Sequence, residues 1–105
     1  MYRGTTPTNT ITVDLDLRGM TVFVTYAQNG TVIFEKSNDD ITIEETQVMV
    51  PLTQADTLAL SARNKGETVN VQIRAINGAG VAIASNIMRT TAEAILKDGE
   101  IAYAT

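Results

Sequence analysis

The chain of 105 residues contains no cysteine and no histidine. Without cysteine it has no disulfide framework, no thiolate nucleophile and no zinc–thiolate site, which is consistent with a reducing compartment. Without histidine it also lacks the common nucleophile–base pairs and the two-histidine metal motifs. The enzymes still compatible with this composition are the smaller group that works with carboxylates, Lys, Ser or Tyr. We therefore expect a protein that is not an enzyme and has no metal or cofactor.

Clustered positive charge is missing as well, because eight Lys and Arg residues are spread along a chain with twelve acidic residues. A phosphate backbone requires grouped cations, so the formal net charge of −4 predicts no nucleic-acid partner. No apolar run approaches the roughly 18 residues of a membrane span, and we expect no membrane partner. Residues 1–7 lack the apolar core of a signal peptide, so we expect no export by a cleaved signal peptide.

The remaining composition is ordinary for a globular domain, with 44% hydrophobic and 19% charged residues. A chain of this length fits one domain that buries roughly 65% of the surface of its unfolded state. We place this single domain at residues 9–99. Residues 1–8 are small and polar, and we expect them to form an extended N-terminal arm. Residues 100–105 form a C-terminal tail in which Ile101 and Tyr103 alternate with alanine.

The strongest local signal lies in residues 22–36, where two β-rich runs flank Asn29-Gly30, a pair typical of hairpin turns. If the loop comprises residues 28–30 with Gly30 in the left-handed conformation, the large apolar side chains gather on one face. The facing pairs are then Tyr26 with Val32 and Val24 with Phe34.

A two-residue loop would shift the pairing of this hairpin. Val24 would lie opposite Glu35, and Tyr26 opposite Ile33, which mixes core and solvent residues. Because a one-residue slip turns every side chain to the other face, we favour the three-residue loop with a bulge. We therefore predict that the four apolar side chains of the two facing pairs share one buried face.

Alternation of apolar and polar residues predicts further strands. They cover residues 10–17, a hairpin over 41–50, residues 67–76, and a last long strand or broken pair over 81–87. With about seven strands and a turn signal about every 8–12 residues, we expect an antiparallel β-sandwich of the all-β class. Its expected outline is immunoglobulin-like or fibronectin-like, although the Trp and Cys hallmarks of antibody domains are absent.

Two segments have helical signals. Thr53 is placed to cap the backbone amide of Asp56 and so to start one short helical turn. Residues 92–97 have the composition of one or two turns that end at Asp98-Gly99.

Carboxylates are the abundant metal-ligating side chains of this sequence. Asp14 and Asp16 project from one face if residues 10–17 form a strand, and such a pair can bind calcium, but a solvated strand face explains them better. The densest acidic group lacks the spacing of a calcium loop and is also interpreted as solvated surface. Its members are Asp39, Asp40, Glu44 and Glu45.

Three other patterns have simpler structural explanations. Gly78–Gly80 lacks the third glycine and the following helix of a phosphate-binding loop, and we interpret it as a turn. Asn29–Thr31 matches a glycosylation sequon but is explained by the hairpin. The three tyrosines, at positions Tyr2, Tyr26 and Tyr103, are too far apart in the sequence to suggest a platform on which bases or sugars stack. We therefore assign no catalytic, metal-binding or cofactor-binding residue.

Five segments, in order, carry a family resemblance: Met1–Thr8, Thr25–Gly30, Leu52–Leu58, Val71–Arg74 and Ile95–Gly99. Together they resemble small uncharacterised proteins encoded in the structural-gene region of Firmicutes prophages. The plan of strands and turns is also similar, more distantly, to the N-terminal domain of phage baseplate upper proteins. This resemblance implies a non-enzymatic structural or adaptor protein of a phage tail or baseplate that acts through protein–protein contacts. It implies partners among phage structural proteins, and a location in the host bacterial cytoplasm during assembly and then in the virion.

An alternative function is that of a carbohydrate-binding or adhesion β-sandwich module. Sugar-binding modules usually expose aromatic side chains, and 5% aromatic residues with no tryptophan weaken this alternative.

The two ends of the chain bear on assembly. On a monomer the tail, residues 100–105, would fray or add to an edge of its own sheet. In a particle it can add a strand to a neighbouring copy instead. Because particle proteins work as symmetric copies, we expect a homo-oligomer held by sheet edges or by these ends.

Overall fold

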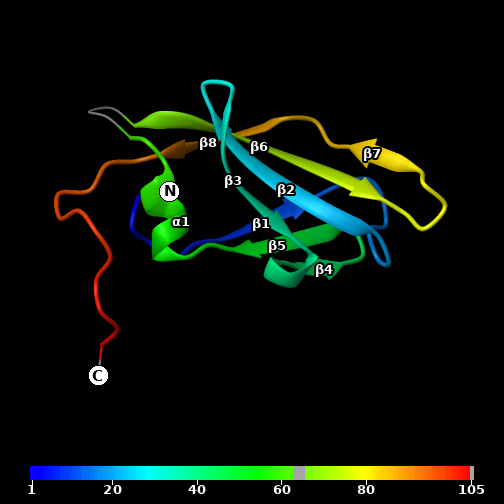
Figure 1. The fold of residues 1–105 in the computed structure, drawn as a ribbon, viewed down its shortest axis with the longest axis horizontal. Coiled ribbons are helices and arrows are strands. Elements are labelled where there is room, and N and C mark those ends of the chain that lie inside the picture. Colours follow the sequence, from blue (N-terminus) through cyan, green and yellow to red (C-terminus); the bar gives the residue numbers. More distant parts are fainter. Residues whose placement is uncertain (63–65, 105) are drawn as a thin grey trace.

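The chain folds into two antiparallel β-sheets that form a sandwich (Figure 1). The structure is a computed structural model that describes residues 1–62 and 66–104. In chain order its elements are β1 (Thr8–Thr12), β2 (Thr21–Gln28), β3 (Thr31–Ser37), the 3-10 helix η1 (Asn38–Asp40), β4 (Thr42–Glu44), β5 (Gln47–Pro51), α1 (Gln54–Ala59), β6 (Glu67–Ile76), β7 (Ala82–Ala84) and β8 (Met88–Ala92).

The strand order makes the sandwich immunoglobulin-like, as predicted. One sheet has the order β1-β5-β4, and the other has β3-β2-β6 with both β7 and β8 paired to β6. These orders match strands B-E-D and C′-C-F-G of the immunoglobulin fold, with β7 and β8 sharing the place of strand G. Within the described residues no strand occupies the place of strand A, so the outer edge of β1 has no strand beside it.

The turn of the β2–β3 hairpin differs from the predicted one. It has two residues, Asn29 and Gly30, with φ angles of 51° and 77°, and Gln28 pairs with Thr31. The predicted three-residue loop is therefore wrong. Two consecutive positive φ angles are the signature of the turn whose twist matches that of the flanking strands, and Asn-Gly is well suited to it.

A β-bulge within the hairpin restores the pairing of apolar residues. The register shifts between Tyr26 and Ala27, so Tyr26 pairs with the half-buried Phe34, and the two rings stack with centroids 4.5 Å apart. Val24 lies on the same inner face, but it pairs with Lys36, so the predicted pair of Val24 with Phe34 is wrong. Val32, which we predicted there, pairs with Ala27 instead and is 59% exposed. The prediction of one shared face is thus correct for three of its four residues and wrong for Val32.

The strand predicted over residues 10–17 is shorter in the structure, because β5, the strand that pairs with it, extends no further. β1 stops at Thr12, and the chain bends at residues 14–15. Beyond Thr12 the partner chain enters the tight β4–β5 turn, where Glu45 has a φ of 53°. The carbonyl of Glu45 accepts a hydrogen bond from the Leu17 N–H at 2.8 Å. Leu17 is completely buried, whereas Leu15 is 44% exposed, so the predicted common face for both is wrong.

The second hairpin and the first helical turn agree with the sequence. Ile43 pairs with Val48 across the β4–β5 hairpin. The Thr53 hydroxyl accepts a hydrogen bond from the Asp56 N–H at 3.1 Å, and the Asp56 carboxylate accepts one from the Thr53 N–H at 2.8 Å. This reciprocal capping box starts α1 as expected.

The helix predicted over residues 92–97 is not formed. Ala92 ends β8, and Glu93 continues in extended form beside the N-terminal arm. The Glu93 N–H donates to the Met1 carbonyl at 2.8 Å, and the Glu93 carbonyl accepts from the Arg3 N–H at 3.0 Å. These non-local partners outweigh a local helical preference that is weak in a segment this short.

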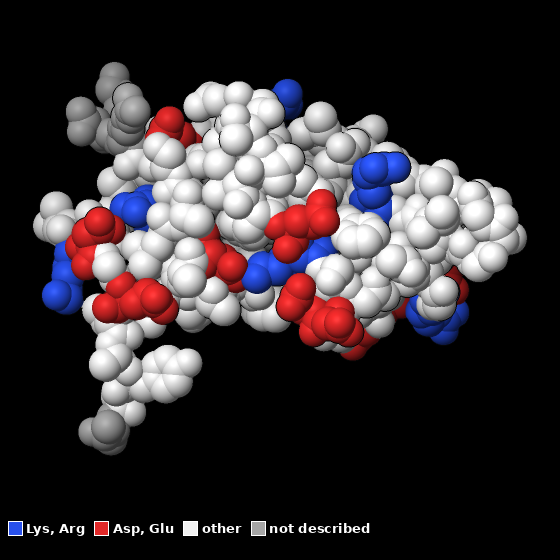
Figure 2. Space-filling view, viewed as in Figure 1, with Lys and Arg blue, Asp and Glu red and all other residues white. Residues whose placement is uncertain are grey.

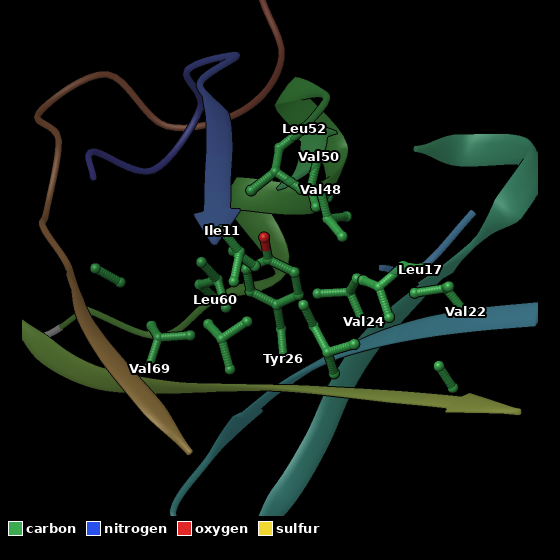
Figure 3. Packing of buried hydrophobic residues seen from close by; sticks show 14 residues of the cluster. Ile11, Leu17, Val22, Val24, Tyr26, Val48, Val50, Leu52, Leu60 and Val69 are labelled. Atoms are coloured by element: carbon green, nitrogen blue, oxygen red, sulfur yellow. The ribbon is translucent and has the colours of Figure 1, made fainter. Parts of the chain in front are cut away.

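Side chains from both sheets form one core between them (Figure 3). The predicted inward residues of β6, at alternate positions from Val69 to Ala75, are all buried. Tyr26 projects from β2 into the middle of the cluster, where its hydroxyl accepts a hydrogen bond from the Asn9 side chain. The buried members are Ile11, Leu17, Val22, Val24, Tyr26, Val48, Val50, Leu52, Leu60, Val69, Val71, Ile73, Ala75 and Ala92.

The arm and the tail are anchored to different degrees. Arg3 of the arm donates to two carbonyl oxygens at the end of α1, at 2.8 and 2.9 Å. The tail leaves the sandwich beside α1 (Figure 1). Its Ile101 N–H donates to the Gln54 side chain at 2.8 Å, and the Gln54 amide donates to the Ile101 carbonyl at 3.0 Å. The predicted tail also includes Thr105, which lies outside the described residues.

Candidate functional site

The two aspartates considered as a calcium pair do not act together. Arg18 donates to both carboxylate oxygens of Asp16, with Nη2 at 2.7 Å from Oδ2 and Nε at 3.0 Å from Oδ1. These hydrogen bonds lower the pKa of the Asp16 carboxyl to about 2 and raise the pKa of Arg18. Asp14 lies at the bend of the chain and is exposed. Asp16 is therefore one partner of a local surface ion pair.

The predicted acidic group lies on η1, β4 and the turn that follows. Its four side chains are exposed, and the Asp40 carboxylate accepts a hydrogen bond from the Ser37 N–H at 3.3 Å. In residues 1–62 and 66–104, no three acidic side chains come close enough together to form a metal site. Acidic and basic side chains are interspersed on the face that Figure 2 shows.

The glycine and tyrosine patterns also have structural roles. The Asn77 side chain accepts hydrogen bonds from the Ala79 and Val81 N–H groups, both at 2.9 Å, and so closes the turn that contains Gly78–Gly80. The Asn29–Thr31 sequon is the β2–β3 turn. Tyr26 is buried, while Tyr2 and Tyr103 are exposed on the arm and the tail respectively. The three tyrosines form no common platform.

The groups with shifted pKa values carry structural contacts. Burial raises the pKa of Tyr26, against the effect of the hydrogen bond from Asn9. Burial also acts to raise the pKa of Asp56, but hydrogen bonds from Lys36 and Thr53 outweigh it and lower that pKa. No described titratable group with a resolved shift therefore stands free in a cleft as a general acid or base.

The outer face of the five-stranded sheet carries a shallow depression of about 290 Å³. Phe23 and Ile76 are 38% and 41% exposed beside it. Arg74 and Glu35 contribute opposite charges to its lining. The depression is mixed in character, and sequence reasoning did not identify it.

A larger groove runs along the open side of the sandwich, between β1 and its continuation on one sheet and β7–β8 on the other. One part, of about 470 Å³, is lined by residues that include Val13, Leu15, Ile83 and Met88. A second part, of about 300 Å³, follows β1 itself and shares Met88. We call these two neighbouring parts, which share Met88, the open seam. No sequence pattern indicates this groove, because the pairing order that leaves β1 at an edge is not a local property.

The open seam has the properties of an interaction surface. Its apolar side chains are incompletely covered, and it is bordered by strand edges of both sheets that have no partner within the described residues. Exposed apolar side chains beside free strand edges are suited to binding an extended polypeptide segment.

In the described part of the chain, no helix is long and apolar enough to span a membrane.

No family model matches the chain, and no curated protein matches it. Among solved structures, the chain is similar to the V domain of amphioxus IgVJ-C2, with 10% sequence identity and a TM-score of 0.37. The alignment covers 90% of this chain and 97% of that one. The immunoglobulin-like description of the fold follows from the strand order given above.

Proposed function

We propose that the protein is a non-enzymatic structural or adaptor protein of a phage particle, part of a tail or baseplate, that acts through protein–protein contacts. The observation that carries this proposal is the open seam, where an unpaired strand edge borders uncovered apolar side chains. Such an edge is a template for pairing with another chain. The five segments that resemble prophage structural-region proteins supply the particle context.

The proposed partners are further copies of this chain and other phage structural proteins. In this proposal the protein is made in the host cytoplasm and remains in the finished virion. Neither nucleic acid nor a membrane is a partner in this role. The surface charges are mixed in sign on the face shown in Figure 2, which suits contacts between proteins.

Particle composition tests the proposal directly. The prophage is induced in its host, particles are purified by density gradient, and their proteins are quantified by mass spectrometry. We expect this chain in a constant ratio to the tail proteins, and we expect its deletion to yield incomplete particles that a plasmid copy restores. Absence from the particles, together with a normal deletion strain, would contradict the proposal. Neighbouring tape-measure, portal or lysis genes would support it, and metabolic neighbours would count against it.

A carbohydrate-binding role is the second candidate, and the depression on the outer sheet face is the observation that favours it. Phe23 is exposed there, next to Arg74 and Glu35, so an aromatic face and two polar groups converge. Selective binding on a glycan array that is lost in Phe23→Ala would support this role. Equal binding by Phe23→Ala and the unaltered protein would remove the depression as a sugar site.

A further inference from the structure

The outer edge of β1 carries backbone groups that point away from β5, its one neighbouring strand among the described residues. The Pro7 carbonyl accepts a hydrogen bond from the Leu52 N–H at 2.9 Å. Six residues later, the Val13 N–H donates to the Thr46 carbonyl at 2.8 Å. Odd-numbered residues of this stretch therefore direct their backbone groups toward β5, and even-numbered residues direct theirs to the open side. The even-numbered residues of β1 are Thr8, Thr10 and Thr12.

The open seam lies directly beside this edge, and residues 1–62 and 66–104 do not close it. Leu15 is 44% exposed in it, and Val13, Ile83 and Met88 are only partly buried. In an immunoglobulin sandwich, strand A would flank the edge that β1 presents here. A strand added at this place would pair with β1 and cover the part of the seam that follows β1.

The C-terminal tail has the features of such a strand. Ile101 and Tyr103 are 56% and 92% exposed, and in extended backbone their side chains lie on the same side. Ala102 and Ala104 lie on the other side. The described tail, residues 100–104, is as long as the five-residue β1. Apart from the paired hydrogen bonds between Ile101 and Gln54, no side-chain hydrogen bond of the described tail is found.

We propose that the open seam binds the C-terminal tail of a second copy of this chain as an added strand beside β1. Main-chain hydrogen bonds to Thr8, Thr10 and Thr12 would provide the pairing. Ile101 and Tyr103 would enter the seam, and the two alanines would face solvent. This inference deepens the proposed structural role, on which it rests, because it names the partner and the site.

A second copy is favoured over the chain's own tail by the direction in which the tail leaves. The tail runs beside α1 and away from the sandwich (Figure 1), and Gln54 holds Ile101 at that point. Exchange in both directions between two copies closes a two-fold dimer, and the second insertion becomes intramolecular. Closed exchange also leaves neither tail exposed.

Sedimentation velocity of the full chain, from micromolar to millimolar concentration, tests the proposal first. We expect one species with the mass of two chains to grow with concentration. The double variant Ile101→Ser, Tyr103→Ser leaves the seam unchanged but removes the two apolar side chains of the donated tail. We expect its dimer dissociation constant to rise at least about a hundredfold. A strictly monomeric unaltered chain, or an unchanged dimer in the double variant, would refute the proposal.

The acceptor edge is tested with Thr10→Pro and its matched control Thr10→Val. Proline removes the N–H that points to the open side, which an edge strand tolerates, while valine keeps that N–H. We expect Thr10→Pro to be monomeric and Thr10→Val to dimerise. Mixing Thr10→Pro with the double tail variant should give a heterodimer, since one chain supplies an intact tail and the other an intact edge; it should be weaker than the closed dimer because only one tail is inserted. Failure of the mixture to associate would count against the proposal.

Amide hydrogen exchange of the unaltered chain gives a readout that does not depend on any variant folding. We expect the N–H groups of Thr10 and Thr12 to become protected as concentration rises, and those of Asn9 and Ile11 to be protected throughout. Protection of Thr10 at every concentration in a monomer would instead mean that the chain's own tail occupies the seam, and would overturn the proposal. If particles contain the protein but it never self-associates, strand donation is refuted while the structural role stands.

Discussion

An ion pair between Lys36 of β3 and Asp56 of α1 ties the helix to the five-stranded sheet. The Lys36 ammonium lies 2.7 Å from Asp56 Oδ2, and the two side chains are only 16% and 15% exposed. The same ammonium lies 5.7 Å from the ring centroid of Phe34. Asp56 also accepts the Thr53 N–H in the capping box. Asp56→Asn removes the negative charge from the ion pair and from the capping box while it keeps the size of the side chain, and it leaves the contact between Lys36 and Phe34 in place.

We expect Asp56→Asn to lower the free energy of unfolding by about 2 kcal/mol. Exposed ion pairs contribute about 0–1 kcal/mol, whereas breaking a fully buried pair costs about 3–5 kcal/mol. A pair that is about one-sixth exposed lies between these limits. In a double-mutant cycle with Lys36→Met, the coupling energy should be about 1 kcal/mol, because the capping contribution of Asp56 does not involve Lys36. Urea unfolding followed by circular dichroism measures all four stabilities.

The same pair predicts how stability depends on pH. The pKa of Asp56 is lower in the folded chain than its ordinary value of 3.8, so the folded state favours the ionised carboxylate. Its contribution is present above the unfolded pKa and is lost as pH falls through the folded pKa. The stability difference between the unaltered protein and Asp56→Asn should therefore be constant near neutral pH and shrink below about pH 4.

Asp39→Asn is the matched control, because Asp39 is an exposed acidic residue on η1. It should change stability by less than about 0.5 kcal/mol. A loss of stability in Asp56→Asn as small as that in Asp39→Asn would contradict a stabilising role of the Lys36–Asp56 pair. A coupling to Lys36 below about 0.3 kcal/mol would contradict it as well, because the pair would then behave as an ordinary surface contact.

Three further predictions use the same unfolding assay at low protein concentration. Gly30→Ala should lower the free energy of unfolding by about 1 kcal/mol, because Gly30 has a φ of 77°. Gly78→Ala is the control and should be neutral or stabilising. An added Cβ meets no atom within 4 Å at either site, so the comparison isolates the backbone conformation. Leu17→Ala should cost about 3 kcal/mol and Leu15→Ala less than about 1 kcal/mol, and equal costs would contradict the strand break. Gln28→Ala should cost about 2 kcal/mol, because the buried amide makes two 2.7 Å hydrogen bonds to the backbone that follows α1, and a cost near zero would contradict that link.

Local features of the fold could be predicted from the sequence because neighbouring residues carry them. The period-two pattern of β6 correctly placed residues from Val69 to Ala75 on an inner face. The spacing of Thr53 and Asp56 correctly predicted the capped start of α1. The Asn29-Gly30 pair correctly located a hairpin. In each case a few adjacent residues contain the steric or hydrogen-bonding preference that decides the conformation.

Features that depend on distant partners could not be predicted in this way. The bulge beside Tyr26 reconciles a two-residue turn with apolar pairing, and local reasoning treated these as exclusive. Residues 92–97 are not helical because the arm supplies backbone partners for Glu93. The chain bends after Val13 because the partner strand turns at Glu45. Each outcome follows from hydrogen bonds to segments far away in the sequence, which alternation does not encode.

Residue patterns alone were enough to predict an all-β domain, the faces of most strands, and a tail with alternating apolar residues. The position of β1 at an edge, with the backbone groups of Thr8, Thr10 and Thr12 directed to an open side, became evident from the assembled fold. The physical reason is that side-chain burial has a local period, whereas an unpaired backbone edge exists only once all strands have taken their neighbours.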